Sequence, residues 1–416
     1  MKVFLYGNTL NISYYFTLFL RAKGIDAEMY LDNTSPHGHD YPWWEDAALR
    51  PDNLPPWIHY YKTRPFFLLP NRKVKKMIRD FGKCDVALVF CNGPIVAMKA
   101  KVPFLFFSIG SDLNGIDTKD ELKSIYHGNM GLNQKLRRLV KIISYTPLQK
   151  KAILHYASRI GIAMGYQWNP YIKKFGLESK TFRTRMPYDT EKYATATDKK
   201  LFERYKQYDL VFLLISRHSW KKLYNDIKGN DKFLKAYARF VKNYNPNARL
   251  LLLKKGIDFK ESEKLVNELG LNDNVEWLEM MDKDGVRAFE SLPNLVVADQ
   301  FWHDEWFKRF TEDKDAPKIG FGFAGIEAMA AGRPLITAFK DPEYYENNEP
   351  PVLSAFTIEE IYARLIEVYK MTPEERAGIG KRQQEFVNKW HNYQNTIDIY
   401  ISELQKIAAS RTAKTK

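Results

Sequence analysis

Short apolar runs recur along this chain of 416 residues, and each one is followed by a longer segment with helical spacing. The runs are apolar at nearly every position, which is typical of parallel strands covered by helices on both faces. This alternation predicts an α/β chain with doubly wound parallel sheets. In the first half the strand-like runs are VFLYG (3–7), AEMYLD (27–32), DVALVF (85–90), VPFLFFSIG (102–110) and ASRIGIAM (157–164).

A second series of the same kind begins after the polar stretch TATDKK (195–200), so the sequence predicts two Rossmann-like domains. We place an N-terminal domain over 1–190 and a C-terminal domain over 191–384. A helical pattern fills the end of the chain, and we expect residues 385–408 to pack back on the first domain. The apolar runs of the second series are LVFLLIS (210–216), ARLLLLKKG (248–256), NVEWLEM (274–280), NLVVADQF (294–301) and PLITAF (334–339).

Composition limits the class of protein. Hydrophobic residues make up 45% of the chain and charged residues 27%, which excludes the composition of a disordered protein. No run approaches the ~18 apolar residues that cross a bilayer, and the start MKVFLYGN lacks a signal-peptide pattern. Cys84 and Cys91 flank one predicted strand and are too far apart in extended chain for a disulfide. These features predict a cytoplasmic protein with reduced thiols, and any membrane contact would be peripheral.

The balance of charges indicates an anionic partner. The chain has 64 Lys and Arg against 50 Asp and Glu, a formal charge of +14, which suits nucleic acid, a phosphorylated substrate or acidic lipid. Zinc-finger, RNP and basic-zipper signatures are absent, so we expect no nucleic-acid partner. Segments 71–83 and 133–145 have the pattern of basic amphipathic helices, and residues 41–69 are rich in aromatic side chains. These three segments have two interpretations, a surface for anionic membranes or solvated lysines around an aromatic core.

The stretch GFGFAGIEAMAAGRPLIT (320–337) carries most of the chemical information. Its first three glycines let the backbone turn tightly and approach a ligand closely. A helix predicted to begin near Ile326 would present backbone amides and the positive end of its dipole to a diphosphate. Glu327 then falls in the first helical turn, where its carboxylate can accept two hydrogen bonds from a ribose diol.

This stretch resembles the donor-site motif of glycosyltransferase family 4, retaining enzymes with the GT-B fold that use nucleotide-diphosphate sugars. LISRHSWKKLYNDIKGND (214–231) is similar to the family's segment of strand, Arg, loop and Lys-Gly, and RMPYDTEKY (185–193) is similar to its interdomain linker. The resemblance is good over about residues 157–350 and extends over the first 150 residues only in pattern. It implies two Rossmann-like domains that face each other across a cleft, an acceptor-side domain over 1–190 and a nucleotide-sugar-binding domain over 191–384.

Carried over residue by residue, the resemblance implies a role for each donor-site group. Arg217 and Lys228 would neutralise the donor diphosphate and stabilise the departing nucleoside diphosphate. Glu327 would bind the ribose. Two cations and a helix start would do the work of a metal ion, so we expect no metal and no cofactor beyond the nucleotide-sugar co-substrate. The residues implied to line the nucleobase or complete the phosphate cradle are Trp277, Leu278, Met281, Gly320, Phe321, Gly322, Phe323 and Ala324.

The chain departs from the family pattern on both sides of the expected cleft. The family often has a glutamate eight residues before Glu327, assigned to the donor sugar, and Ile319 stands there. We hypothesise that a carboxylate of the long segment 302–318, Asp304 or Glu305, reaches the sugar instead. Asp299 has two interpretations, a loop cap or a residue that lines the cleft. The residues implied on the acceptor side are Gly7, Asn8, Gly110, Ser111 and Asp112.

The resemblance implies a hexosyltransferase-type enzyme that moves a sugar, with retention, from a nucleotide-diphosphate donor to a glycan or lipid-linked acceptor. Surface polysaccharide or glycolipid assembly would be the setting, at the inner face of a membrane if the basic segments dock there. Two alternatives stay open. One is a non-catalytic GT-B protein that binds nucleotide or glycan, and the other is a nucleotide-sugar epimerase.

Overall fold

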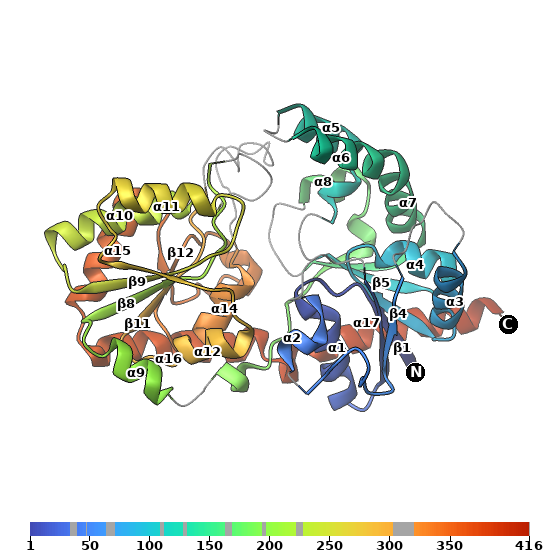
Figure 1. The fold of residues 1–416 in the computed structure, drawn as a ribbon. Coiled ribbons are helices and arrows are strands. Elements are labelled where there is room, and N and C mark those ends of the chain that lie inside the picture. The colour runs from blue at the N-terminus through green and yellow to red at the C-terminus, as the bar shows by residue number, and fades with distance from the viewer. Residues whose placement is uncertain are drawn as a thin grey trace. The chain divides into compact units, whose positions relative to one another are not determined.

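The computed structural model divides into two compact units, each built on its own sheet. The first unit comprises Met1–Met164, Trp168–Tyr188 and Tyr393–Lys416, and the second comprises Gly165–Gln167 and Asp189–Asn392. Both sheets are parallel, with helices on both faces (Figure 1), which confirms the predicted fold class. The structure describes residues 1–33, 40–46, 48–63, 71–108, 112–127, 131–162, 169–193, 197–221, 228–302 and 320–415.

The first sheet has the strand order β3-β2-β1-β4-β5-β6-β7. The chain runs outward from β1 to β3 on one side and from β4 to β7 on the other. The two central strands, β1 and β4, are buried almost throughout, as their continuous apolar sequences predict. The strands are β1 (Lys2–Tyr6), β2 (Asp26–Asp32), β3 (Ile58–Tyr61), β4 (Val86–Val89), β5 (Phe104–Ser108), β6 (Ala157–Ile162) and β7 (Thr181–Arg183).

Nine α-helices of the described chain belong to the first unit. The basic segment 71–83 forms α3, which buries Val74, Met77 and Phe81 and leaves its lysines in solvent. Among the described aromatic residues of 41–69, Trp57 stacks on Tyr14 of α1. The segment 71–83 is therefore a core helix with solvated lysines. The helices are α1 (Ile12–Ala22), α2 (Pro42–Glu45), α3 (Arg72–Phe81), α4 (Gly93–Ala100), α5 (Thr118–His127), α6 (Leu132–Ser144), α7 (Thr146–Lys151), α8 (Asn169–Lys174) and α17 (Tyr393–Thr415).

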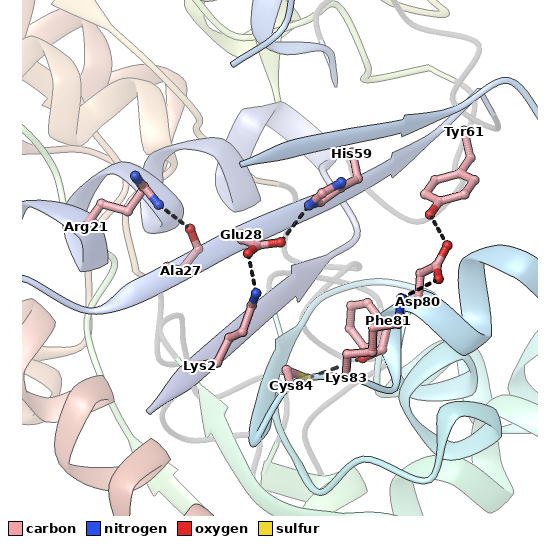
Figure 2. Close-up of polar contacts among 10 residues, drawn as sticks. All are labelled: Lys2, Arg21, Ala27, Glu28, His59, Tyr61, Asp80, Phe81, Lys83 and Cys84. Carbon is pink, nitrogen blue, oxygen red and sulfur yellow. Dashed lines mark hydrogen bonds and ion pairs between the residues drawn. The ribbon is translucent and has the colours of Figure 1, made fainter. Parts of the chain in front are cut away.

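An ionic network joins β1 to β2 and β3, which lie on one side of it in this sheet (Figure 2). Glu28 on β2 accepts hydrogen bonds from the Lys2 ammonium and from the His59 ring, each at 2.6 Å. Burial raises the pKa of the Glu28 carboxyl, but the two hydrogen bonds outweigh burial and the net shift is downward. The network therefore links three adjacent strands through one carboxylate.

The second sheet has the order β10-β9-β8-β11-β12-β13, so its chain also runs outward from a central pair, β8 and β11. Its strands are β8 (Leu210–Leu214), β9 (Ala248–Leu253), β10 (Val275–Leu278), β11 (Leu295–Ala298), β12 (Leu335–Thr337) and β13 (Leu353–Ser354). The helices described in this unit are α9 (Lys199–Tyr205), α10 (Asn230–Asn243), α11 (Phe259–Glu268), α12 (Lys283–Glu290), α14 (Phe323–Ala330), α15 (Ile358–Lys370) and α16 (Pro373–His391).

The helical C-terminus is two helices. The backbone of Asn392 leaves the helical region, with φ −57° and ψ 129°, and separates α16 from α17. Residues 385–391 therefore belong to the second unit, and the helix that packs on the first sheet begins at Tyr393. It packs on β4, β5 and β6. Tyr400 of α17 is fully buried against Phe16 and Phe107, and its hydroxyl donates to the Arg185 carbonyl at 2.7 Å.

We expect Tyr400→Ala to destabilise the first unit by about 3–5 kcal/mol, because it empties an aromatic site in a packed core. Tyr400→Phe is the matched control, which keeps the ring and removes only the hydrogen bond, at a cost of about 1 kcal/mol. Urea unfolding of the full chain, followed by far-UV circular dichroism, measures both. Equal losses for the two variants would contradict the packing role of the ring.

Candidate functional site

The candidate donor site lies where the chain of the second unit reverses its direction of winding, between β8 and β11. The Ile215 amide donates to the Ala298 carbonyl at 3.2 Å, and the Ser216 hydroxyl donates to the Asp299 carbonyl at 2.8 Å. The loops that follow these two strands therefore start side by side. In open parallel sheets the crevice at such a reversal is the place where ligands bind.

Buried Asn230, at the start of α10, holds the loop after β8 in place. Its side-chain oxygen accepts from the Ser219 amide at 3.0 Å, and its amide donates to the Ser216 hydroxyl at 3.3 Å. The Lys228 amide also donates to the Ser219 carbonyl, at 2.6 Å. This bonding brings Lys228 close to Arg217, whose charge acts on the lysine. The sequence reasoning missed Asn230, although an amide directly after Lys-Gly was the available signal.

Lys228 and Arg217 supply positive charge at this site. The Lys228 ammonium donates to the Gln300 side-chain oxygen at 2.7 Å and lies 4.5 Å from the centre of the Trp302 ring. Burial lowers the pKa of Lys228 to about 8, and nearby Arg217 lowers it too, while Asp299 opposes both. Arg217 keeps part of its surface in solvent, and the partial desolvation of its guanidinium lowers its pKa. Two cations held this close together favour binding of an anion.

The glycine-rich loop leads into α14, which begins at Phe323, three residues before the predicted start at Ile326. The helix starts earlier than predicted because its N-cap is Gly322, which is extended with φ −75° and ψ 165°. No side chain caps α14, so the backbone amides of its first turn can donate hydrogen bonds to an anion. Phe321 anchors the loop by stacking on Phe339, with ring centres 4.4 Å apart.

Glu327 lies in the second turn of α14, not in the first turn as predicted, because the helix starts earlier. Its side chain is 8% exposed, and its carboxylate pairs with the Lys283 ammonium at 3.2 Å. Lys283 starts α12, and the sequence analysis did not single it out. Its charge orients the carboxylate proposed to bind ribose.

Three predicted nucleobase-lining residues lie at the end of β10 and just after it. The Trp277 ring is in contact with the His218 ring at 5.4 Å and lies perpendicular to Phe259 at 5.1 Å. Leu278 is buried, and Met281 packs against Gly285, where an added Cβ would lie 3.0 Å from the Met281 Cβ. The Trp277 side chain thus packs against His218 and Phe259, and the backbone after Trp277 remains the candidate lining for the nucleobase.

The first unit has a cavity of about 370 Å³ at the corresponding reversal, between β1 and β4. Gly7 and Asn8, which the sequence analysis assigned to the acceptor side, are among the residues that line it. Gly7 has φ +95°, and an added Cβ would lie 2.4 Å from the Phe90 carbonyl oxygen, so only glycine fits. The Asn8 side chain donates to the Asp40 carbonyl at 2.7 Å.

Carboxylates and phenols make up much of the polar lining of this cavity. The Tyr6 hydroxyl donates to Asp32, and burial raises the pKa of that phenol well above its ordinary value. Asp112, the third described residue of the predicted acceptor set, acts electrostatically on lining residues Cys91 and Tyr145.

Several predicted positions lie outside the described residues: Gly110, Ser111, Asp304, Glu305 and Ile319. Over the described ranges, no group of three or more His, Cys, Asp or Glu side chains could hold a metal ion.

Comparison with known proteins supports a relationship to sugar transferases. Residues 219–386 match the sequence model of the family described as Glycosyl transferases group 1. No curated protein sequence matches the chain.

Solved structures share the fold over nearly the whole chain. Anabaena HepE, solved with UDP and glucose, has a TM-score of 0.65 at 15% identity and covers 98% of this chain and 99% of its own. Sucrose-phosphate synthase from Thermosynechococcus elongatus has a TM-score of 0.63 at 15% identity, covering 99% and 100%. WaaG, a glycosyltransferase of lipopolysaccharide biosynthesis, has a TM-score of 0.57 at 14% identity, covering 95% and 99%. The chain therefore has the GT-B fold.

His218, next to Arg217, generates a prediction about pH. The ring is fully buried, and burial lowers its pKa to about 4 against the smaller, opposite effect of the Leu253 backbone. A lowered pKa gives stability that is complete above the unfolded value of 6.5 and is lost as pH falls toward 4. We expect His218→Phe to remove this acid-linked loss, about 3 kcal/mol in full. Urea unfolding at pH 7 and pH 4.5 tests it, and an unchanged pH dependence in the variant would contradict it.

Proposed function

We propose that this protein is a retaining glycosyltransferase that moves a sugar from a nucleoside-diphosphate sugar to the hydroxyl group of a glycan or lipid-linked acceptor. The observation that carries the proposal is the convergence of Arg217, Lys228 and the start of α14 at the β8–β11 reversal. Glu327 follows one turn further along that helix. The family match over residues 219–386 contains most of this site. HepE was solved with UDP-glucose, which favours a uridine nucleotide as the first donor to test.

In the proposed reaction the bond between the sugar anomeric carbon and the donor phosphate oxygen breaks, while the acceptor oxygen bonds to that carbon on the same face. The acceptor proton passes to the departing phosphate, so no side chain is assigned as general base. Arg217, Lys228 and the amides of Phe323 and Ala324 stabilise the charge that develops on the leaving diphosphate. Because these groups stabilise that charge themselves, we propose that the reaction needs no metal ion.

We assign the acceptor to the first unit's cavity, lined by Gly7 and Asn8. Its carboxylate and phenol groups can hydrogen-bond several sugar hydroxyls at once. A glycan or lipid-linked saccharide for surface polysaccharide or glycolipid assembly fits such a lining.

We also propose that the protein contacts anionic membranes through α5 and α6. No helix of the described chain is long and apolar enough to span a bilayer. α6 keeps its apolar stripe in solvent, at positions spaced three and four residues apart. It carries Lys135, Arg137, Arg138 and Lys141 and no acidic residue. The exposed large apolar side chains of the two helices are Leu122, Tyr126, Leu132, Leu136, Leu139, Val140 and Ile143.

Nucleotide binding is the first expected outcome. In a thermal-shift panel of UDP, GDP, ADP, CMP and their sugars, one nucleotide should stabilise the wild type by about 2.7 kcal/mol at 100 times its dissociation constant. Arg217→Ala and Glu327→Ala should abolish the shift, because they remove a phosphate contact and the ribose contact. Lys221→Ala is the control, since this exposed lysine follows the same strand but pairs with Glu261. A panel without any shift would contradict the donor site.

Turnover separates the alternatives. Release of the free sugar or its transfer from the nucleotide that binds would exclude a non-catalytic protein. Conversion of the donor sugar into its epimer, with the nucleotide still attached, would identify an epimerase instead.

Membrane contact has its own expected outcome. Ile143→Asp should weaken binding to vesicles of phosphatidylcholine and phosphatidylglycerol by about tenfold, as measured by sedimentation. The substitution places a charge within the apolar stripe, at a residue that is 76% exposed. Ile257→Asp adds the same charge at a 60%-exposed site in the second unit and should change nothing. Wild-type protein that fails to bind these vesicles would overturn the assignment.

A further inference from the structure

One acidic side chain lies next to the glycine loop at which the proposed site would bind an anion. Asp299 directly follows β11 and is 3% exposed, and its Oδ2 atom has no hydrogen-bond partner. A Cβ added to Gly322, the N-cap of α14, would lie 2.8 Å from Oδ2, and one added to Gly325 would lie 3.4 Å away. The carboxyl group thus lies directly beneath the glycine loop.

Burial and the neighbouring charged groups determine the pKa of the Asp299 carboxyl. Burial raises the pKa of Asp299 to about 6, and the negative charge of Glu327 raises it as well. Lys228 and the backbone amide of Gly322 act in the opposite direction, by stabilising the charged form. These two are also the groups on which a donor diphosphate would depend. An ionised Asp299 and a bound diphosphate would therefore compete for the same partners and repel each other.

We propose that Asp299 couples donor binding to protonation: when the diphosphate of a nucleotide sugar binds at the glycine loop, the Asp299 carboxylate takes up one proton from solvent. The proton forms an O–H bond on the carboxylate, which removes the repulsion and turns an acceptor into a hydrogen-bond donor. This inference rests on the proposed function, because it needs a donor that carries a diphosphate.

The direction of the pH dependence follows from this coupling. A diphosphate makes the neutral form of Asp299 more favourable, so the pKa of Asp299 rises on binding. Between the free and bound values, affinity falls as pH rises, by at most tenfold per pH unit, and it levels off below about pH 6. Lys228 adds proton uptake of its own near and above pH 8, since an anion also raises its pKa.

Isothermal titration calorimetry with UDP-glucose measures the coupling directly. The diphosphate of this probe is a diester and does not titrate between pH 5 and 8, unlike that of UDP. At pH 6.5, in two buffers of different ionisation enthalpy, we expect the wild type to take up a large fraction of one proton and Asp299→Asn to take up almost none. At pH 8 Asp299→Asn should bind at least tenfold more tightly than the wild type, because the amide mimics the protonated acid.

A matched control is Glu290→Gln. Glu290 is 1% exposed, both of its oxygens lack partners, and burial raises the pKa of its carboxyl well above its ordinary value. It ends α12, where the charges that act on it are those of Glu327, Arg287, Arg333 and Lys283. It should stay protonated throughout, so this variant should take up as many protons as the wild type.

The possible outcomes separate the two proposals. Binding of UDP-glucose to the wild type without proton uptake, or with equal uptake in Asp299→Asn, overturns the role of Asp299 and leaves the proposed function standing. Failure of every nucleotide sugar in the panel to bind overturns the proposed function. If another nucleotide sugar binds instead, it replaces UDP-glucose as the probe. Because uptake is measured on the wild type, the proposal is tested even if Asp299→Asn does not fold.

Discussion

Parallel pairing between strands that are distant in the chain is the constraint on which both units depend. β1 pairs with β4, and β8 pairs with β11. In each sheet the later strands are added on one side after the first strand of the pair and on the other side after the second. The helical connections therefore do not cover the carboxyl ends of the two central strands. One pair opens onto the cavity beside Gly7, and the other brings Ser216 next to Asp299. Both candidate sites are consequences of one topological rule.

Both candidate sites also need glycines that let two backbone segments approach each other closely. Gly7 permits contact with the carbonyl of Phe90, where any Cβ would overlap that oxygen. Gly229, with φ +68°, turns the chain from Lys228 into α10, and an added Cβ would lie 3.2 Å from the Phe301 carbonyl carbon. The turn at Gly229 helps to hold Lys228 beside the end of β11.

The second unit also places ionisable groups in surroundings that disfavour their charges. Lys228, Asp299 and His218 all have pKa values shifted toward the neutral form, with burial as the largest cause. Burial of charged groups at a ligand site costs stability in the free protein, and a ligand of opposite charge recovers part of that cost. Such groups make the affinity for an anion depend on pH, which a set of fully solvated lysines would not do.

The sequence by itself determined the fold class, the strands of both sheets apart from the short β3, β7 and β13, the loop that carries Arg217 and Lys228, and the helix that carries Glu327. It could do so because continuous apolar runs and glycine turns act locally. Only the tertiary structure decided that α3 buries its apolar face while α6 exposes one, since the two sequences have the same pattern. It also brought Lys283 to Glu327, and Asp299 to Gly322. These pairs are distant in the chain, and their contact depends on strand order and helix packing, which no local pattern encodes.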